Sequence, residues 1–143
     1  VSTRAGAGAV GIEALSRGAA FVHFVEMRRE AVAALEENLA ICGPPASRYH
    51  VHTARVAGLL ASEANPMRDC SIIYADPPYE LDLEEEFFSG LDAGRFPSLR
   101  TVVVEHRTKQ PVLPQPSLRC DHSRRFGDTT LTYLVPTTLA QEG

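Results

Sequence analysis

The order of secondary-structure patterns along the chain is the feature that most limits its fold. Strand-like runs occupy 21–26, 48–53, 70–75 and 100–106. Helical patterns separate them: a glycine-rich turn that leads into a short helix ending near Gly18, a longer helix over 28–43, a weaker one over 56–64 and an acidic one over 83–91. Strands that alternate with helices predict an α/β fold with a mostly parallel sheet.

The last part of the chain departs from this alternation. After a loop broken by Pro111, Pro114 and Pro116, the segments 118–126 and 129–135 predict an antiparallel hairpin with Gly127 and Asp128 in its turn. In the longest helix, the spacing of the apolar residues predicts one buried face, formed by Val32, Leu35, Leu39 and Cys42.

Length and composition indicate the general class of protein. The 143 residues contain no repeat or low-complexity segment, which predicts a single domain over 1–143. We expect no membrane segment, because no apolar run is long enough to span a bilayer. The three cysteines have no metal-type spacing, which favours reduced thiols in a cytoplasmic protein. Because the first residue is Val1, we expect the domain to be incomplete at its N-terminus.

A glycine-rich loop and a later carboxylate indicate a nucleotide cofactor. Residues 6–11 match the pattern G-x-G-x-x-G, in which glycines let the backbone approach a ligand closely and the helix start offers free N–H groups. Glu26 ends the next strand, where its carboxylate can accept hydrogen bonds from both ribose hydroxyls of an adenosine. Nicotinamide cofactors and S-adenosylmethionine both carry that ribose, so these residues alone do not distinguish them.

The segment Asp76-Pro77-Pro78-Tyr79 follows the strand-like run 70–75 and favours amino-group methylation. The Asp76 carboxylate and the Pro77 carbonyl can accept both hydrogens of an exocyclic amine, and the prolines fix where these acceptors point. The carboxylate also stabilises the positive charge that develops on the nitrogen. The ring of Tyr79 can stack on a base turned out of its helix. The alternative is a simple turn that leaves the strand.

Four blocks resemble the RsmD-type 16S ribosomal RNA guanine-N2 methyltransferases: GAVGIEALSRGA, FVEMRREAVAALEENLA, YADPPYE and RRFGDTTLTYL. The resemblance implies a Rossmann-like methyltransferase fold, S-adenosylmethionine as the donor, and 16S rRNA or the assembling small subunit as the partner. It also implies that Glu26 holds the ribose and that Met27 packs near the adenine. It assigns the methionine end of the cofactor to Ala5, Gly6 and Gly8, and the target base to Asp76, Pro77, Pro78 and Tyr79.

The chain departs from this family at the cofactor edge. Family members have Asp-Leu-Phe where this chain has Ser2-Thr3-Arg4, and commonly Asp where it has Arg28. Arg55 occupies the position of an Asp or Asn that reads the adenine amino group, and an arginine cannot accept that hydrogen bond. The five residues before Gly6 are too few for the central strand of this fold, so we expect that strand to be missing and its neighbours to be unpaired.

Two other functions compete with methyl transfer. The chain could be an inactive remnant that binds RNA or a protein partner, which the departures at the cofactor edge favour. It could also be a nicotinamide-dependent oxidoreductase, which only the glycine spacing and Glu26 support. The net charge is −4, but residues 95–125 hold seven Arg or Lys against two acidic residues. Within that stretch, Arg124 and Arg125 suit either contact with RNA phosphates or a plain surface turn. His50 and His52 share a predicted strand face, which is a weak indication of a metal site.

Overall fold

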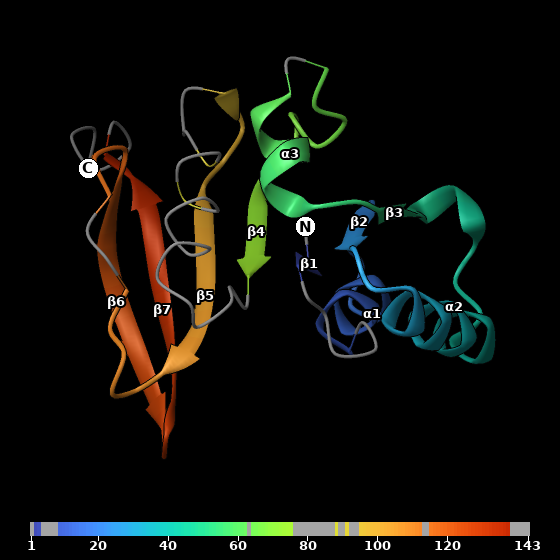
Figure 1. Ribbon diagram of the computed structural model, residues 1–143, viewed down its shortest axis with the longest axis horizontal. Coiled ribbons are helices and arrows are strands. Elements are labelled where there is room, and N and C mark those ends of the chain that lie inside the picture. The colour runs from blue at the N-terminus through green and yellow to red at the C-terminus, as the bar shows by residue number, and fades with distance from the viewer. Residues whose placement is uncertain are drawn as a thin grey trace.

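The computed structural model describes residues 2–3, 9–62, 64–75, 88, 91, 95–112 and 115–137. Across these residues the strands form one sheet of seven in the order β3-β2-β1-β4-β5-β7-β6 (Figure 1). The first five strands pair in parallel, and β7 pairs antiparallel with both β5 and β6. This confirms the predicted parallel sheet and terminal hairpin. The strands are β1 Ser2–Thr3, β2 Val22–Glu26, β3 Tyr49–Thr53, β4 Ile72–Ala75, β5 Thr101–Arg107, β6 Leu118–Phe126 and β7 Thr129–Pro136.

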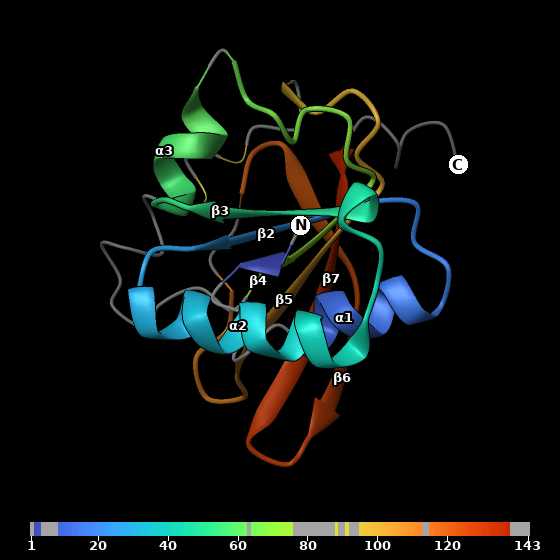
Figure 2. The ribbon, with the colours of Figure 1, turned by 90° about the vertical axis from the view of Figure 1, so that its right-hand side faces the viewer.

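Helices cover the two faces of the sheet. The helices α1 (Ala9–Ser16) and α2 (Arg29–Cys42) lie side by side on one face, and α3 (Val56–Ala61) lies on the other (Figure 2). A 3₁₀ turn, η2 (Ala46–Arg48), leads into β3. Among the described helices, none has both the length and the apolar character that a membrane crossing requires.

Glycines end two of these helical segments, as the sequence predicts. Gly18 and Gly43 both have positive φ, at 102° and 72°. The Gly43 N–H donates to the Leu39 carbonyl over 2.9 Å, which closes α2. The predicted buried face of α2 is only partly confirmed: Leu35 and Leu39 are buried, but Cys42 is exposed. The buried stripe therefore ends before the last turn of the helix.

The apolar core consists of two clusters on opposite faces of the sheet. The first joins α1 and α2 to β2 through Leu15, Val22, Phe24, Leu35 and Leu39. The second lies on the α3 face and includes side chains from β4, β5, β6 and β7 together with Phe88 and Leu91. Phe88 and Leu91 are the described residues of the predicted acidic helix over 83–91, whose remaining residues lie outside the described part of the chain.

The central strand is present, which corrects the prediction that it would be missing. Ser2 pairs with Phe24 of β2 and Tyr74 of β4, and Thr3 pairs with Val25 and Ala75. Two residues are enough because strand pairing depends on neighbours distant in sequence, and β2 and β4 offer a matched slot on either side. The strand reaches only the carboxyl ends of its neighbours. Towards the other edge, a cavity of about 600 Å³ lies between β2 and β4, lined in part by Val22, His23 and Ile72.

Candidate functional site

The segments that carry the predicted chemistry all follow the carboxyl ends of adjacent strands. Thr3 lies between Val25 and Ala75 in the register of β2, β1 and β4. In the sequence, the glycine motif begins three residues after Thr3, Glu26 follows Val25, and Asp76 follows Ala75. The chain runs from β1 outwards to β3 on one side and continues from β4 on the other, so the strand order switches between β1 and β4. Open α/β sheets bind their ligands at this position.

Glu26 is a buried carboxylate at this edge, with 6% of its surface exposed. Its Oε1 accepts a hydrogen bond from Arg28 Nε at 2.9 Å, and its Oε2 accepts one from the Met27 backbone N–H at 3.1 Å. The two donors offset the cost of removing the charged group from water. The pair with Arg28 could not be read from the family pattern, in which this position is commonly acidic. It fixes the direction of the Glu26 carboxylate.

Met27 and Arg55 lie beside Glu26. The Met27 side chain is 57% exposed, which leaves an apolar surface next to the carboxylate. Glu26 pairs with Thr53 at the end of β3, and the Ala54 N–H donates to the Glu26 carbonyl over 3.1 Å. Arg55 is the next residue and precedes α3 as its exposed N-cap. The structure thus brings Glu26, Met27 and Arg55 together at one end of the sheet.

The remaining site residues lie outside the described part of the chain. These are Ala5, Gly6 and Gly8 in the glycine loop, and the target-base segment Asp76, Pro77, Pro78 and Tyr79. Their roles stay predictions. The last glycine of the motif, Gly11, is described and has a structural explanation. A Cβ placed on Gly11 would lie 2.3 Å from Phe24 Cε1, so only glycine lets α1 pack this closely on β2.

The residues at this edge fit the adenosine part of a cofactor. A buried, oriented carboxylate suits two ribose hydroxyls, and the exposed Met27 side chain suits one face of a flat base. The Glu26 oxygens each accept one of the described hydrogen bonds and have lone pairs for further donors. Arg55 carries donors and no acceptor, and its place at the adenine amino group stays a prediction.

A histidine cluster lies on the face of β2 and β3 opposite to that of Glu26. His23 Nδ1 and His52 Nε2 are 3.0 Å apart, so one of these two nitrogens donates a hydrogen bond to the other. The rings of His50 and His52 are in edge contact, with centroids 4.4 Å apart. Sequence reasoning paired His50 with His52 but missed His23, which lies 29 residues from His52 and reaches it through the parallel register.

Burial and the neighbouring His52 lower the pKa of His23 to about 4, and burial also lowers the pKa of His52. These imidazoles are therefore neutral near pH 7. Among the described residues, no group of three or more His, Cys, Asp or Glu side chains could hold a metal ion.

The strand order, the paired helices on one face and the ligand edge at the switch between β1 and β4 define a Rossmann-like fold of the methyltransferase type. Solved structures agree. A proposed methylase from Haemophilus influenzae superposes with a TM-score of 0.74 at 22% identity, covering 94% of this chain and 85% of that one. The Escherichia coli protein yhhF, a proposed methyltransferase, gives a TM-score of 0.74 at 25% identity, with 94% and 75% covered.

The family model described as conserved hypothetical protein 95 matches residues 1–135. The chain therefore belongs to this family, and the RsmD-type resemblance is confirmed. The chain is 36% identical over 88 residues to the ribosomal RNA small subunit methyltransferase D of Escherichia coli strain K12. That match covers 62% of this chain and 42% of the relative, so it spans less than half the length of the curated protein.

Proposed function

We propose that the protein transfers a methyl group from S-adenosylmethionine to the exocyclic N2 amino group of a guanine in 16S rRNA, in the cytoplasm. The observation that carries the proposal is the register around Thr3. It sets Val25 and Ala75, the residues before Glu26 and Asp76, on either side of Thr3. Thr3 precedes Gly6 by three residues in the sequence. Family membership and the name of the curated relative support the same reaction class.

In this proposal each segment has one task. Glu26 accepts hydrogen bonds from the ribose hydroxyls, with its direction set by Arg28 and the Met27 N–H. The cofactor supplies a methyl group activated on a sulfonium. The Asp76 carboxylate and the Pro77 carbonyl accept the two amine hydrogens, which directs the nitrogen lone pair at that methyl. The bond from sulfur to the methyl would break as the bond to nitrogen forms, which leaves S-adenosylhomocysteine as the other product. Asp76 would stabilise the positive charge on nitrogen until the extra proton passes to its carboxylate or to water, while Tyr79 stacks on the base.

A second candidate is an inactive remnant that binds RNA or a protein partner. The observation that favours it is the ion pair at the cofactor edge, where Arg28 Nε is already 2.9 Å from Glu26 Oε1. A ribose must share that oxygen with the guanidinium or displace it. The two candidates differ in cofactor binding, which a remnant has no need to retain.

The deciding experiment combines calorimetric titration of S-adenosylmethionine with an assay of labelled methyl transfer to deproteinised bacterial 16S rRNA. Mass spectrometry of the digested RNA identifies the modified nucleoside. We expect cofactor binding, transfer to RNA and N2-methylguanosine as the product. The Asp76→Ala variant should lose transfer yet bind the cofactor nearly as well, because Asp76 is assigned to the acceptor.

Each outcome has a clear consequence. Cofactor binding without transfer to 16S rRNA or to small subunits would contradict the proposed substrate. An absence of cofactor binding would favour the remnant. If Asp76→Ala abolished cofactor binding, the role given to Asp76 would be wrong.

A further inference from the structure

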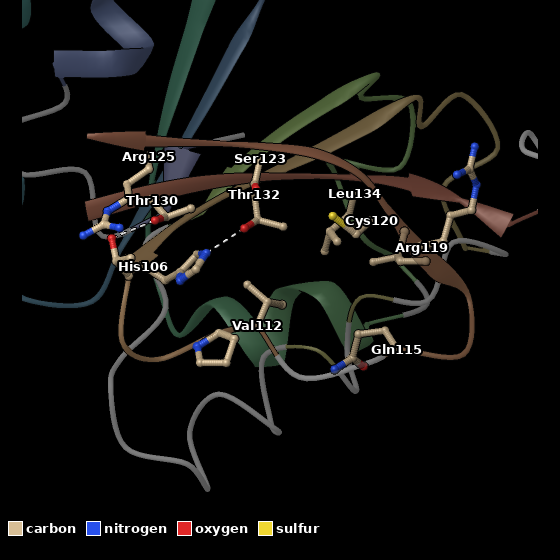
Figure 3. A pocket seen from close by; sticks show the side chains of 13 residues that line it. His106, Val112, Gln115, Arg119, Cys120, Ser123, Arg125, Thr130, Thr132 and Leu134 are labelled. Carbon is tan, nitrogen blue, oxygen red and sulfur yellow. Dashed lines mark hydrogen bonds between the residues drawn. The ribbon is translucent and has the colours of Figure 1, made fainter. Parts of the chain in front are cut away.

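The hairpin carries a second cavity, of about 600 Å³, on the α3 face of the sheet (Figure 3). Its floor is the inward face of β5, β7 and β6, and residues after β5 line its other side. The thirteen described residues that line it include Arg119, Arg125 and His106, and none of these thirteen is Asp or Glu. Within the described lining the charged side chains are thus basic, which favours an anion.

The strand register explains why two acidic residues of the described strands do not line this cavity. Glu105 and Asp121 are the acidic residues within 95–125. Glu105 pairs with Leu131, on the opposite face of the sheet from Val104 and His106, and accepts a hydrogen bond from the Tyr74 hydroxyl at 2.8 Å. Asp121 is the extra residue of the bulge between Cys120 and His122. Its Oδ2 lies 2.8 Å from His122 Nδ1, and its Oδ1 lies 3.9 Å from Nη2 of the lining residue Arg119.

The same register separates two neighbouring arginines. Arg125 pairs with Thr130, and both line the cavity. Arg124 pairs with Leu131 on the opposite face and does not line the cavity. The Arg125 Nε donates to the Gly127 carbonyl over 3.0 Å, which orients the guanidinium and leaves its terminal nitrogens as the remaining donors. Arg125 and Arg119 lie at opposite ends of the cavity in Figure 3. Arg119 pairs with Val135, on the face of Arg124, and its Nη2 is 3.9 Å from Asp121 Oδ1, so Arg125 is the arginine on the cavity face.

The wall between the arginines is polar and ordered. His106 Nδ1 lies 2.9 Å from the carbonyl oxygens of Arg107 and Gln110, so Nδ1 carries a proton. His106 Nε2 lies 2.6 Å from the Thr132 hydroxyl oxygen, within hydrogen-bond distance. Thr108 donates to the Gly127 carbonyl and is 2.8 Å from the Thr130 hydroxyl. The threonine hydroxyl oxygens keep lone pairs that can accept hydrogen bonds from sugar hydroxyls.

The cavity also lies close to the edge where the target-base segment begins. Arg107 at the end of β5 pairs with Thr129 at the start of β7, so the hairpin turn lies at the carboxyl edge of the parallel strands (Figure 1). β7 is two strands away from β4, after which Asp76 follows. Strands are spaced about 4.8 Å apart, which puts the cavity roughly 10 Å from β4.

We propose that this cavity seats a nucleotide of the acceptor RNA strand next to the methylated one, with its phosphate on Arg125 and its ribose on the threonine wall. The inference rests on the proposed function, since it names a contact of the same RNA substrate. A single strand that places one base after β4 passes the hairpin at this distance. The volume matches sites that enclose a small ligand, and Arg125 on the cavity face, with no Asp or Glu among the described lining residues, suits a phosphodiester.

The test compares Arg125→Gln with Arg124→Gln, which remove the same charge from opposite faces of one strand. Binding to deproteinised bacterial 16S rRNA is measured over a salt series. We expect Arg125→Gln to weaken binding about tenfold and to lower the log–log salt slope by roughly 1, with Arg124→Gln close to wild type. Cofactor titration and thermal unfolding show that both variants keep the fold. A second variant, Ser123→Asp, places a carboxylate in the cavity and should weaken RNA binding as Arg125→Gln does.

Equal losses in the two arginine variants would overturn the inference, because they would show general attraction to a basic surface. Binding of guanosine monophosphate at Arg125 as tight as that of the RNA would also overturn it, in favour of a free nucleotide. Methyl transfer by the wild type separates this failure from that of the proposed function. If the wild type methylates RNA and the variants match each other, only the cavity assignment is wrong. If the wild type neither binds nor methylates RNA, both proposals fail.

Discussion

At the scale of single residues, Glu26 is the described residue on which the proposed cofactor site depends most. It is buried, and both of its oxygens already accept hydrogen bonds. The sequence alone gives the carboxylate at the end of a strand but not its state, since the Arg28 contact depends on how the chain turns after β2. The family pattern is also misleading at position 28, where it commonly has an acidic residue and this chain has Arg28. A basic residue here stabilises the buried charge and at the same time occupies part of the surface a ribose would use.

Glu26→Gln should weaken S-adenosylmethionine binding by about 10- to 100-fold. The amide lacks the charge that strengthens hydrogen bonds from ribose hydroxyls, and one of its polar ends is a donor. Isothermal titration measures the change. Glu30→Gln is the matched control, because Glu30 is an exposed carboxylate in the first turn of α2. Equal affinity for wild type and Glu26→Gln would remove Glu26 from the cofactor site.

At the scale of elements, the contact between α1 and β2 fixes the helix that follows the glycine-rich segment. Leu15 of α1 and Phe24 of β2 are buried in one cluster, and Gly11 brings the helix onto the Phe24 ring. The last glycine of a nucleotide-binding pattern therefore supports the fold, while the earlier ones are the predicted ligand contacts. Arg48 of η2 reinforces the far end of α1 by donating to the Leu15 and Ala19 carbonyls.

Gly11→Ala should lower the free energy of unfolding by about 1–3 kcal/mol. The added methyl would lie 2.3 Å from Phe24 Cε1, and this ring is 1% exposed and enclosed by the core. Chemical denaturation measures the loss. Gly58→Ala in α3 is the control, since a Cβ there meets no atom within 4 Å and should be neutral or stabilising. If both variants were equally stable, the close packing of α1 would not be what requires glycine.

Most elements were predictable because their signals are local. Strand runs, the glycines that end helices and the hairpin turn at Gly127 all depend on nearby residues, and the structure has them close to the predicted bounds. The central strand was wrongly predicted to be absent, because two residues carry no pattern and gain their structure from distant neighbours. His23 joining His52 and the split between Arg124 and Arg125 depend on register in the same way. The position of Glu26 at the end of its strand was predicted correctly, but its contact with Arg28 was not predicted.

At the scale of the whole molecule, the histidine cluster makes stability depend on pH. The pKa of His23 is lowered from 6.5 to about 4 in the folded state, so between these values the unfolded chain binds more protons. We expect the free energy of unfolding to be highest above about pH 6.5 and to fall as the pH drops towards 4. Carboxylates also titrate near the lower limit, so the difference between wild type and His23→Leu isolates the histidine term.

That difference should be constant above pH 6.5 and should change between pH 6.5 and 4, with the variant losing less stability on acidification. Denaturant unfolding at a series of pH values measures it. Parallel curves for the two proteins would show that His23 does not titrate with folding. His52, whose pKa is also lowered by burial, contributes in the same direction.

The two-residue strand β1 has a mechanical consequence for the molecule. Backbone hydrogen bonds through Ser2 and Thr3 join β2 and β3 to the other strands, and the two core clusters lie on opposite faces. Side-chain packing also joins the two parts, since Val25 of β2 belongs to the same core cluster as Ile73 and Ala75 of β4. The backbone hydrogen bonds between the two parts are confined to the carboxyl edge of the sheet. A ligand that contacts both Glu26 of β2 and the residues after β4 would add a further connection between the two parts of the sheet. Binding of that ligand would make the two parts unfold together, so the ligand would stabilise the fold as well as take part in the reaction.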